Sequence, residues 1–241
     1  MLKPVPAALV SLFLFLCAST FADSFPKVDA DLAEYDAAIE KMKAAFASVP
    51  EDTASKDWIA KKLQHMVDID QHMRKFGTSA PHDHQYTKAE QEYFGSKFFM
   101  DRWLSLDRQN TTDLKSLLKT HSWFTISQFG KKCDNNAWLL VQHADYDPEF
   151  QKEILARLEK LYAAGETRPQ NYAYLWDRVA LSSSDPSKRQ PQRYGTQGHC
   201  VAPGKWEPFP IEDETNVDAR RAEVGLQPLA EYIAVFQDIC K

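Results

Sequence analysis

The sequence predicts a mainly α-helical, bundle-like single domain with a small β-hairpin or irregular element near its C-terminus. Three observations predict this class: apolar residues recur at helical spacing, Gly and Pro separate these stretches, and Gly and Pro cluster over 192–211. Aromatic residues form 12% of the 241 residues, enough to build a substantial core. Disordered and collagen-like chains are therefore excluded.

The first 22 residues have the pattern of a secretory signal peptide. Lys3 is their only charged residue, an apolar stretch covers 7–16, and small residues at positions 20 and 22 allow cleavage after Ala22. The apolar stretch is too short to span a bilayer comfortably. Cleavage would leave the 219 residues of 23–241 and change the formal net charge from −5 to −6.

The mature chain is therefore expected in the periplasm or outside the cell, where a disulfide can form. Cys133, Cys200 and Cys240 allow three single pairings, and a pair of Cys200 with Cys240 would tie down the C-terminal segment. Cys17 leaves lipoprotein processing open as an alternative. The acidic balance gives no support to nucleic-acid binding, and no later segment is expected to cross a membrane.

In the N-terminal half, helices are predicted over 29–48, 53–76 and 87–107. The first two form a candidate helical hairpin, 23–77, packed on the rest of the domain. Residues predicted to end or interrupt these helices are Pro50, Gly77 and Pro81, with a loop over 78–85. Asn110 or Thr111 is expected to cap a short fourth helix that reaches Lys119.

In the C-terminal half, residues 123–130 are expected to be extended or irregular, whereas 137–144 form a helix that is apolar all round and therefore buried. Later helices should begin or end at Asp147-Pro148, Gly165, Pro169, Asn216, Gly225 and Pro228. A polar loop over 182–191 and the hairpin or coil over 192–211 separate the long helices from the two short ones.

The tetrapeptide Gln142-His143-Ala144-Asp145 is the strongest candidate for chemistry. A histidine titrates near neutrality and can serve as a general base or acid. Asp145 can reach His143 only if the helix ends between them, which the helix start at Asp147-Pro148 predicts. The alternative is a buried His and Asp whose hydrogen bonds fix a turn between two helices.

Two further segments carry polar groups that suit a pocket. Asp177-Arg178 points away from the apolar stripe of its helix, either as a solvated face or as an Arg that binds an anionic or carbonyl group. The segment 192–197 is rich in donors and acceptors. As a strand it would place Gln192, Tyr194 and Thr196 on one side, so only one of its two faces can line a pocket. The alternative is a surface hairpin.

Asp70 and Arg74 are four residues apart on one predicted helix and can pair, either within a site or as a surface ion pair. Arg220-Arg221 flanks a short helix and can be a surface contact. No histidine pair has a known zinc spacing, and phosphate-binding Gly-rich loops and nucleophile elbows do not occur. No metal and no cofactor are therefore expected.

Several motifs between Ile69 and Tyr232 together resemble an uncharacterised bacterial family of domains. The motifs that carry the resemblance are Gln142-His143-Ala144-Asp145, Asp177-Arg178-Val179, Tyr194-Gly195-Thr196-Gln197, Asp70-Gln71 with Arg74, and Arg220-Arg221. The resemblance implies a shared fold and a shared site. It supplies no substrate.

Two functions fit these patterns. The first is an exported, cofactor-independent hydrolase or group-transfer enzyme with the catalytic residues His143, Asp145, Asp177 and Arg178. Its substrate-binding residues would be Gln142, Tyr194, Thr196, Gln197, Asp70, Arg74 and Trp123. The second is a cell-envelope module that binds a small molecule, peptide, glycan or protein and contains a structural polar network. The first predicts that His143, Arg178 and Tyr194 converge on one cleft, and their placement on opposite faces would exclude it.

Overall fold

The computed structural model describes residues 24–237 and 240, so the expected signal peptide lies outside the described residues. The described chain is mainly helical with one small β-hairpin, as the sequence predicts. The helices are α1 (Pro26–Ala47), α2 (Lys56–Asp83), α3 (Lys88–Phe98), α4 (Leu104–Leu117), α5 (Ile126–Gln142), α6 (Pro148–Ala163), α7 (Pro169–Ala180), α8 (Val217–Glu223) and α9 (Leu229–Gln237). The strands are β1 (Gly198–Ala202) and β2 (Lys205–Pro208).

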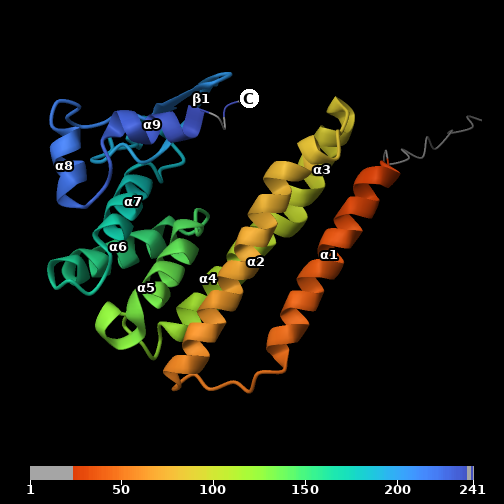
Figure 1. Ribbon diagram of the computed structural model, residues 1–241, viewed down its shortest axis with the longest axis horizontal. Helices are drawn as coiled ribbons and strands as arrows, with labels where there is room; N and C mark the ends of the chain where they lie inside the picture. Colours follow the sequence, from red (N-terminus) through yellow and green to blue (C-terminus); the bar gives the residue numbers. More distant parts are fainter. Residues whose placement is uncertain (1–23, 238–239, 241) are drawn as a thin grey trace, which may run out of the picture.

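Helix α2 lies at the centre, with α1 on one side and the C-terminal half of the chain on the other (Figure 1). Two hydrophobic cores flank it. The core shared with α1 and α3 includes Val28, Leu32, Ile69, Met73, Phe94 and Phe98. The core shared with α4 to α7 includes Ile59, Leu63, Leu114, Leu140, Ile154 and Leu158. Because α2 contributes to both cores, α1 and the C-terminal half of the chain pack against the same helix.

The predicted end of α2 at Gly77 and the loop over 78–85 are wrong: the helix continues through Pro81 to Asp83. Gly77 serves packing rather than helix termination. A Cβ atom at this position would overlap the Phe98 ring and come 3.0 Å from Cζ3 of Trp103. The bare backbone of Gly77 therefore lets both rings lie directly on α2.

The predicted boundary at Asn110 or Thr111 is also wrong, because helical structure runs from Lys88 to Leu117. Thr87 begins it with a capping box, in which Glu90 and Thr87 satisfy each other's backbone N–H groups. A single π-helical turn, Phe99–Trp103, joins α3 to α4. The extra residue of such a turn rotates the following side chains, and here it brings Trp103 against α2.

The segment 123–130 is extended only as far as Thr125, since α5 begins at Ile126. The irregularity expected there is a break at Gly130, whose φ of 80° suits glycine. The next helix starts as predicted: Asp147 caps α6 by accepting a hydrogen bond from the backbone N–H of Phe150, and Pro148 follows. It ends at Ala163, just before Gly165.

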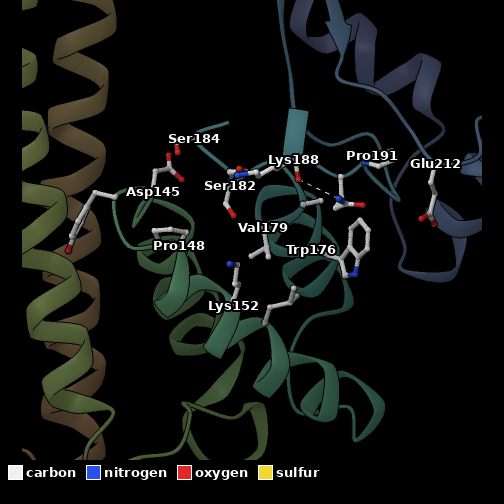
Figure 2. Close-up of a pocket in the computed structure, with 15 residues that line it drawn as sticks. Asp145, Pro148, Lys152, Trp176, Val179, Ser182, Ser184, Lys188, Pro191 and Glu212 are labelled. Atoms are coloured by element: carbon white, nitrogen blue, oxygen red, sulfur yellow. Dashed lines mark hydrogen bonds between the residues drawn. The ribbon is translucent and has the colours of Figure 1, made fainter. Parts of the chain in front are cut away.

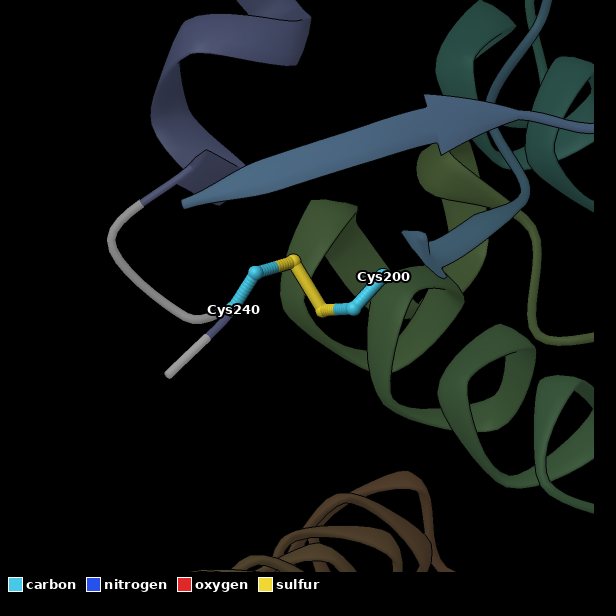
Figure 3. The surroundings of a disulfide bond; sticks show 2 residues. All are labelled: Cys200 and Cys240. Carbon is cyan, nitrogen blue, oxygen red and sulfur yellow. A yellow bond between two sulfur atoms is a disulfide. The ribbon is translucent and has the colours of Figure 1, made fainter. Parts of the chain in front are cut away.

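The two strands form an antiparallel hairpin near the C-terminus. A disulfide joins Cys200 on β1 to Cys240, which ties the end of the chain to the hairpin (Figure 3). Of the three pairings that the sequence allows, the structure thus selects the one that closes the C-terminal segment, and Cys133 is a buried thiol. Within residues 24–237 and 240, no helix is both long and apolar enough to cross a membrane.

The packing of Gly77 generates a stability prediction. We expect Gly77→Ala to lower the free energy of unfolding by about 1 kcal/mol, because overpacking of ~1–3 kcal/mol outweighs the ~1 kcal/mol that Ala gains over Gly in a helix. Gly95→Ala is the matched control, since no atom lies within 4 Å of a Cβ at that helical position. It should stabilise the protein by ~0.5–1 kcal/mol in urea unfolding. Equal stabilisation by both substitutions would contradict this account.

Candidate active site

A buried carboxylate, Asp70, is the centre of the polar site. It lies on α2, one turn before Arg74, and has no exposed surface. Its Oδ1 is 2.9 Å from Nδ1 of His143, the residue that caps the end of α5, and 3.1 Å from Nε of Arg74. Gln71 donates to Oδ2 over 2.8 Å. The alternative of a surface ion pair at Asp70 and Arg74 is therefore excluded, and the contact with His143 connects α2 to the end of α5.

Nδ1 of His143 lies 2.9 Å from both Oδ1 of Asp70 and Nε of Arg74, so the charge of Asp70 decides which nitrogen carries the proton. Burial raises the pKa of Asp70, but the hydrogen bond and charge of His143 and the charge of Arg74 bring it below its usual value. Burial lowers the pKa of His143 by more than Asp70 raises it, so the imidazole is neutral at pH 7. We assign the proton to Nδ1, which donates to the ionised Asp70, and Nε of Arg74 then donates to Oδ1 of Asp70 rather than to the imidazole. Nε2 is left as the basic nitrogen.

The basic nitrogen is open to solvent. The His143 side chain retains 17% exposure, and Nε2 forms no hydrogen bond with the described residues. Nε2 therefore differs from the fully enclosed polar atoms without a hydrogen-bond partner, such as Oε1 of Gln142. A carboxylate that holds Nδ1–H and leaves Nε2 free is the arrangement of an oriented general base.

Asp107 on α4 is a second acid of this site, and sequence reasoning missed it. Its Oδ1 accepts a 2.6 Å hydrogen bond from Nη2 of Arg74, whose guanidinium also lies 4.7 Å above the Trp103 ring. Burial raises the pKa of Asp107 to about 7, with Arg74 opposing the shift and the charges of Asp70 and Asp145 adding to it. No sequence pattern marks Asp107, because its partner is 33 residues away in the chain.

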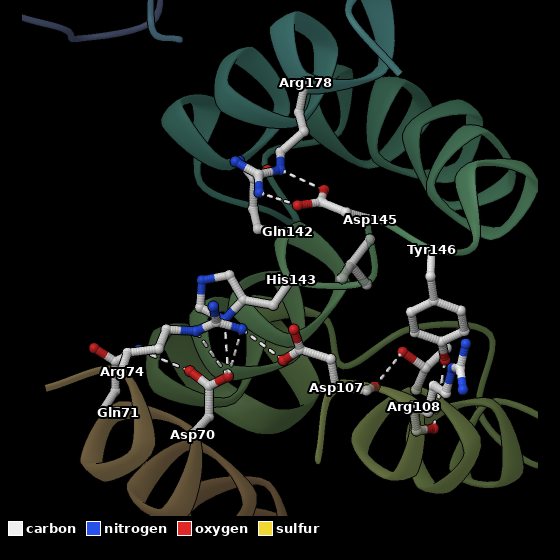
Figure 4. Close-up of polar contacts among 12 residues, drawn as sticks. Asp70, Gln71, Arg74, Asp107, Arg108, Gln142, His143, Asp145, Tyr146 and Arg178 are labelled. Carbon is white, nitrogen blue, oxygen red and sulfur yellow. Dashed lines mark hydrogen bonds and ion pairs between the residues drawn. The ribbon is translucent and has the colours of Figure 1, made fainter. Parts of the chain in front are cut away.

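Asp145 does not orient His143 but pairs with Arg178 of α7. Nε of Arg178 donates to Oδ1 of Asp145 over 2.7 Å, a second bond joins Nη2 to Oδ2, and Nη1 donates to Gln197. The pair is partly exposed and holds the pKa of Asp145 below its usual value, although burial opposes this. Figure 4 shows His143 between the Asp145–Arg178 pair and the Asp70–Arg74 pair. The sequence-predicted residues thus form two adjacent ion-paired groups.

Asp177, predicted as a catalytic residue, is buried, so the alternative of a solvated position is excluded. Its two oxygens accept four hydrogen bonds, from the backbone N–H groups of Arg193, Tyr194 and Thr196 and from the Thr196 hydroxyl. Burial still raises its pKa. All of these donors belong to one loop, so Asp177 fixes the loop that follows it rather than a pocket.

The segment 192–197 consequently does not form the expected strand but wraps around Asp177. Tyr194 packs inward against Ala173, and Thr196 is also buried. The expected surface contact at Arg221 is wrong too, because this guanidinium is fully buried and donates to the carbonyl of Tyr194 over 2.6 Å. Of the three residues expected to share a cleft, Tyr194 is therefore turned away, whereas His143 and Arg178 belong to the same polar region.

Trp123 and Gln142 are the two remaining residues proposed for substrate binding. Trp123 is buried and donates its indole N–H to Asp134 over 2.8 Å. Asp134, which sequence reasoning missed, also accepts from Thr167 and Asn171 and joins α5 to the start of α7. Gln142 is buried, and its Oε1 has no partner among the described residues. Trp123 thus has a place in the core rather than in a pocket.

A cavity beside the site has a volume of about 1010 Å³ (Figure 2). It lies between α6, α7 and the loop over 182–191. Asp145 and Tyr146 form its edge on the side of the polar site, although His143 does not line it. In the described part of the chain, no three His, Cys, Asp or Glu side chains are grouped so that they could hold a metal ion. The candidate active site therefore consists of the two ion-paired groups beside this cavity.

The environment of Asp107 generates a pH prediction. The folded protein holds the Asp107 proton up to about pH 7, whereas the unfolded chain releases it near pH 4. Folding stability should therefore fall as the pH rises between these values, and Asp107→Asn should remove this part of the pH dependence. Carbon NMR of the Asp carboxyl groups should show an Asp107 midpoint near 7. Asp145 is the control and should titrate below its usual range; an Asp107 midpoint near 4 would contradict the prediction.

Comparison with known proteins places the chain in a family. A model described as a family of unknown function, DUF6624, matches residues 58–241, more than half of the chain. No curated protein and no solved structure matches it. The matched stretch contains both ion-paired groups, and α1 precedes it. The chain therefore belongs to the family of unknown function DUF6624.

Proposed function

We propose that the protein is a cofactor-independent hydrolase or group-transfer enzyme in which Nε2 of His143 is the general base. One observation carries this proposal: a fully buried carboxylate, Asp70, holds Nδ1–H of His143 and leaves Nε2 accessible to solvent. A neutral imidazole fixed in this way can accept a proton from water or from a hydroxyl group at pH 7. Asp70 then stabilises the imidazolium that forms, because the two groups are already hydrogen-bonded.

Asp107 supplies a second group that can exchange protons near neutral pH. Arg74 links it to the partner of His143, since Nε of Arg74 donates to Asp70 over 3.1 Å while Nη2 donates to Asp107. A proton added to His143 makes the region more positive and therefore favours ionisation of Asp107. Groups whose pKa values lie near the working pH are best suited to acid–base catalysis. Asp107 is thus the proposed partner acid.

The Asp145–Arg178 pair is the proposed site for the charge that develops on the substrate. Its side chains are 59% and 31% exposed, respectively, so a bound molecule can reach them from solvent. Arg178 presents several N–H donors in a plane, and such a group can stabilise an oxyanion. Gln197 holds the guanidinium from the other side.

We also propose that the chain is exported to the periplasm or beyond. The signal-peptide pattern over 1–22 is the primary support. The Cys200–Cys240 disulfide adds to it, because disulfides persist in oxidising compartments and are rare in the cytosol. A cell-envelope location would give the enzyme access to extracellular or envelope substrates.

A ligand-binding module of the cell envelope is the second candidate function. The observation that favours it is that the large cavity ends at Asp145 and is not lined by His143. A protein of this kind would use the cavity for binding, and the Asp70–His143 network would hold α2 and α5 together. Substitution of His143 distinguishes the two candidate functions, because only the enzyme needs this side chain for turnover.

We expect His143→Ala to lower turnover by roughly 10²- to 10⁴-fold, the contribution of a general base. The assay is a panel of chromogenic esters, phosphate esters, glycosides and peptide anilides, with the wild-type chain as reference. Asp70 keeps Arg74 and Gln71 as partners in this variant, so the free energy of unfolding should fall by only about 1–2 kcal/mol.

His82→Ala is the matched control, because this imidazole is 79% exposed and lies outside the site. It should retain full activity and stability. If His143→Ala keeps wild-type turnover, or if it loses about 3–5 kcal/mol of stability while ligand binding in the cavity persists, the network is structural and the binding function holds.

Export predicts a defined N-terminus. When the full-length gene is expressed in a bacterium, the chain recovered from the periplasm should begin at Asp23, because signal peptidase cuts after small residues at these positions. Intact-mass spectrometry would detect the loss of residues 1–22. Ala22→Pro should block the cut and leave the longer chain in the membrane fraction. A full-length chain in the cytosol would contradict export, and a lipid-modified Cys17 would indicate lipoprotein processing.

A further inference from the structure

We infer that the cavity beside Asp145 binds the substrate, and that this substrate is an anion, a carboxylate or phosphate, attached to an apolar or aromatic body. The inference rests on the proposed function, which needs a substrate site next to His143. The cavity is large enough for such a molecule, since ligand pockets commonly enclose about 300–1,000 Å³. Asp145, which Arg178 holds by two hydrogen bonds, lines the edge of this cavity.

The positive charges that line this cavity are available to a ligand. Lys152 and Lys188 line it from opposite sides, from α6 and from the loop over 182–191 (Figure 2). Their ion-pair partners, Glu149 and Asp185, do not line the cavity. Both pairs are exposed, and exposed pairs contribute little free energy. Either ammonium group can therefore turn from its partner to an anion in the cavity.

The two carboxylates that line the cavity differ in how firmly they are paired. Asp145 is held by two hydrogen bonds from Arg178, and Glu212 at the opposite edge pairs with Arg193 at 3.2 Å. A carboxylate fixed by a guanidinium neither repels an anion strongly nor attracts a cation. A ligand at the Asp145 edge of the cavity therefore meets the positive charges of Lys152 and Lys188, whereas Glu212 remains in an exposed ion pair at the opposite edge.

The uncharged residues that line the cavity indicate which non-ionic part of a ligand would fit. Trp176, Leu155 and Val179 form an apolar side, and one face of the Trp176 indole is fixed by the Arg193 guanidinium 5.1 Å from the ring. Hydroxyl groups of Ser182 and Ser184 lie along the loop side, where they can donate to anionic oxygens. Two flexible cations, hydroxyl donors and an indole wall match an aromatic or acyl anion better than a neutral sugar or a cation.

The test uses two fluorescent probes that differ in charge, 8-anilinonaphthalene-1-sulfonate and its neutral relative N-phenyl-1-naphthylamine. The double variant Lys152→Gln/Lys188→Gln should bind the anionic probe about tenfold more weakly and the neutral probe with less than a twofold change. The control Lys88→Gln/Lys160→Gln removes two exposed lysines that do not line the cavity and should bind both probes as the wild type does. Thermal unfolding of each variant checks that it is folded.

Competition identifies the anion. Benzoate and phenyl phosphate should displace the anionic probe from the wild type, and the stronger competitor shows whether a carboxylate or a phosphate is preferred. Phenyl β-glucoside should not displace it. Absence of saturable binding, equal weakening of both probes in the Lys152/Lys188 variant, or displacement by the glucoside alone would overturn the inference.

The same titration in His143→Ala separates this inference from the proposed function. Retained anion binding together with lost turnover supports both. Retained anion binding with unchanged turnover overturns the catalytic role of His143 and leaves the anion site standing. If the wild type shows no preference for the anionic probe but His143→Ala still loses turnover, the anion site alone is overturned.

Discussion

The carboxylate of Asp70 is the interaction on which the arrangement of this protein depends. It is fully buried on α2, and a buried charge is tolerated only when hydrogen-bond donors surround it. Those donors come from Gln71 and Arg74 on its own helix and from His143 at the end of α5. Arg74 in turn reaches Asp107 on α4. One desolvated carboxylate thus connects α2, α4 and α5, and the same hydrogen bonds prepare His143 for proton transfer.

Two other buried carboxylates, Asp134 and Asp177, show why chemistry is assigned to Asp70. Asp177 accepts four hydrogen bonds from neutral backbone and hydroxyl groups, and Asp134 is surrounded by Trp123, Thr167, Asn171 and the backbone N–H of Arg168. None of these donors changes its charge near neutral pH, so both carboxylates fix loops and helix ends. Asp70 differs because one of its donors is an imidazole whose second nitrogen faces solvent. The titratable partner His143, rather than the carboxylate itself, therefore distinguishes Asp70 from Asp134 and Asp177.

The two halves of the site are linked by charge and by position. Arg178 and Arg74 both lower the pKa of His143, and Asp145 helps to raise that of Asp107. A substrate anion near Asp145 and Arg178 would therefore alter the proton affinity of both proposed acid–base groups. Packing supports this arrangement: the π-helical turn brings Trp103 to Arg74, and the absence of a side chain at Gly77 permits that approach.

The sequence by itself determined the helical class, the helix starting at Asp147-Pro148, the C-terminal hairpin and the polar residues worth attention, because periodicity and capping act over a few residues. It did not determine that Gly77 serves packing rather than helix termination, because the Phe98 and Trp103 rings that need its bare backbone are 21 and 26 residues away in the chain. Likewise, nothing local distinguishes Asp70, which faces His143, from Asp177, which faces backbone N–H groups. Only the tertiary structure decided these partners, since the burial and pairing of a charge are set by which distant elements pack against it.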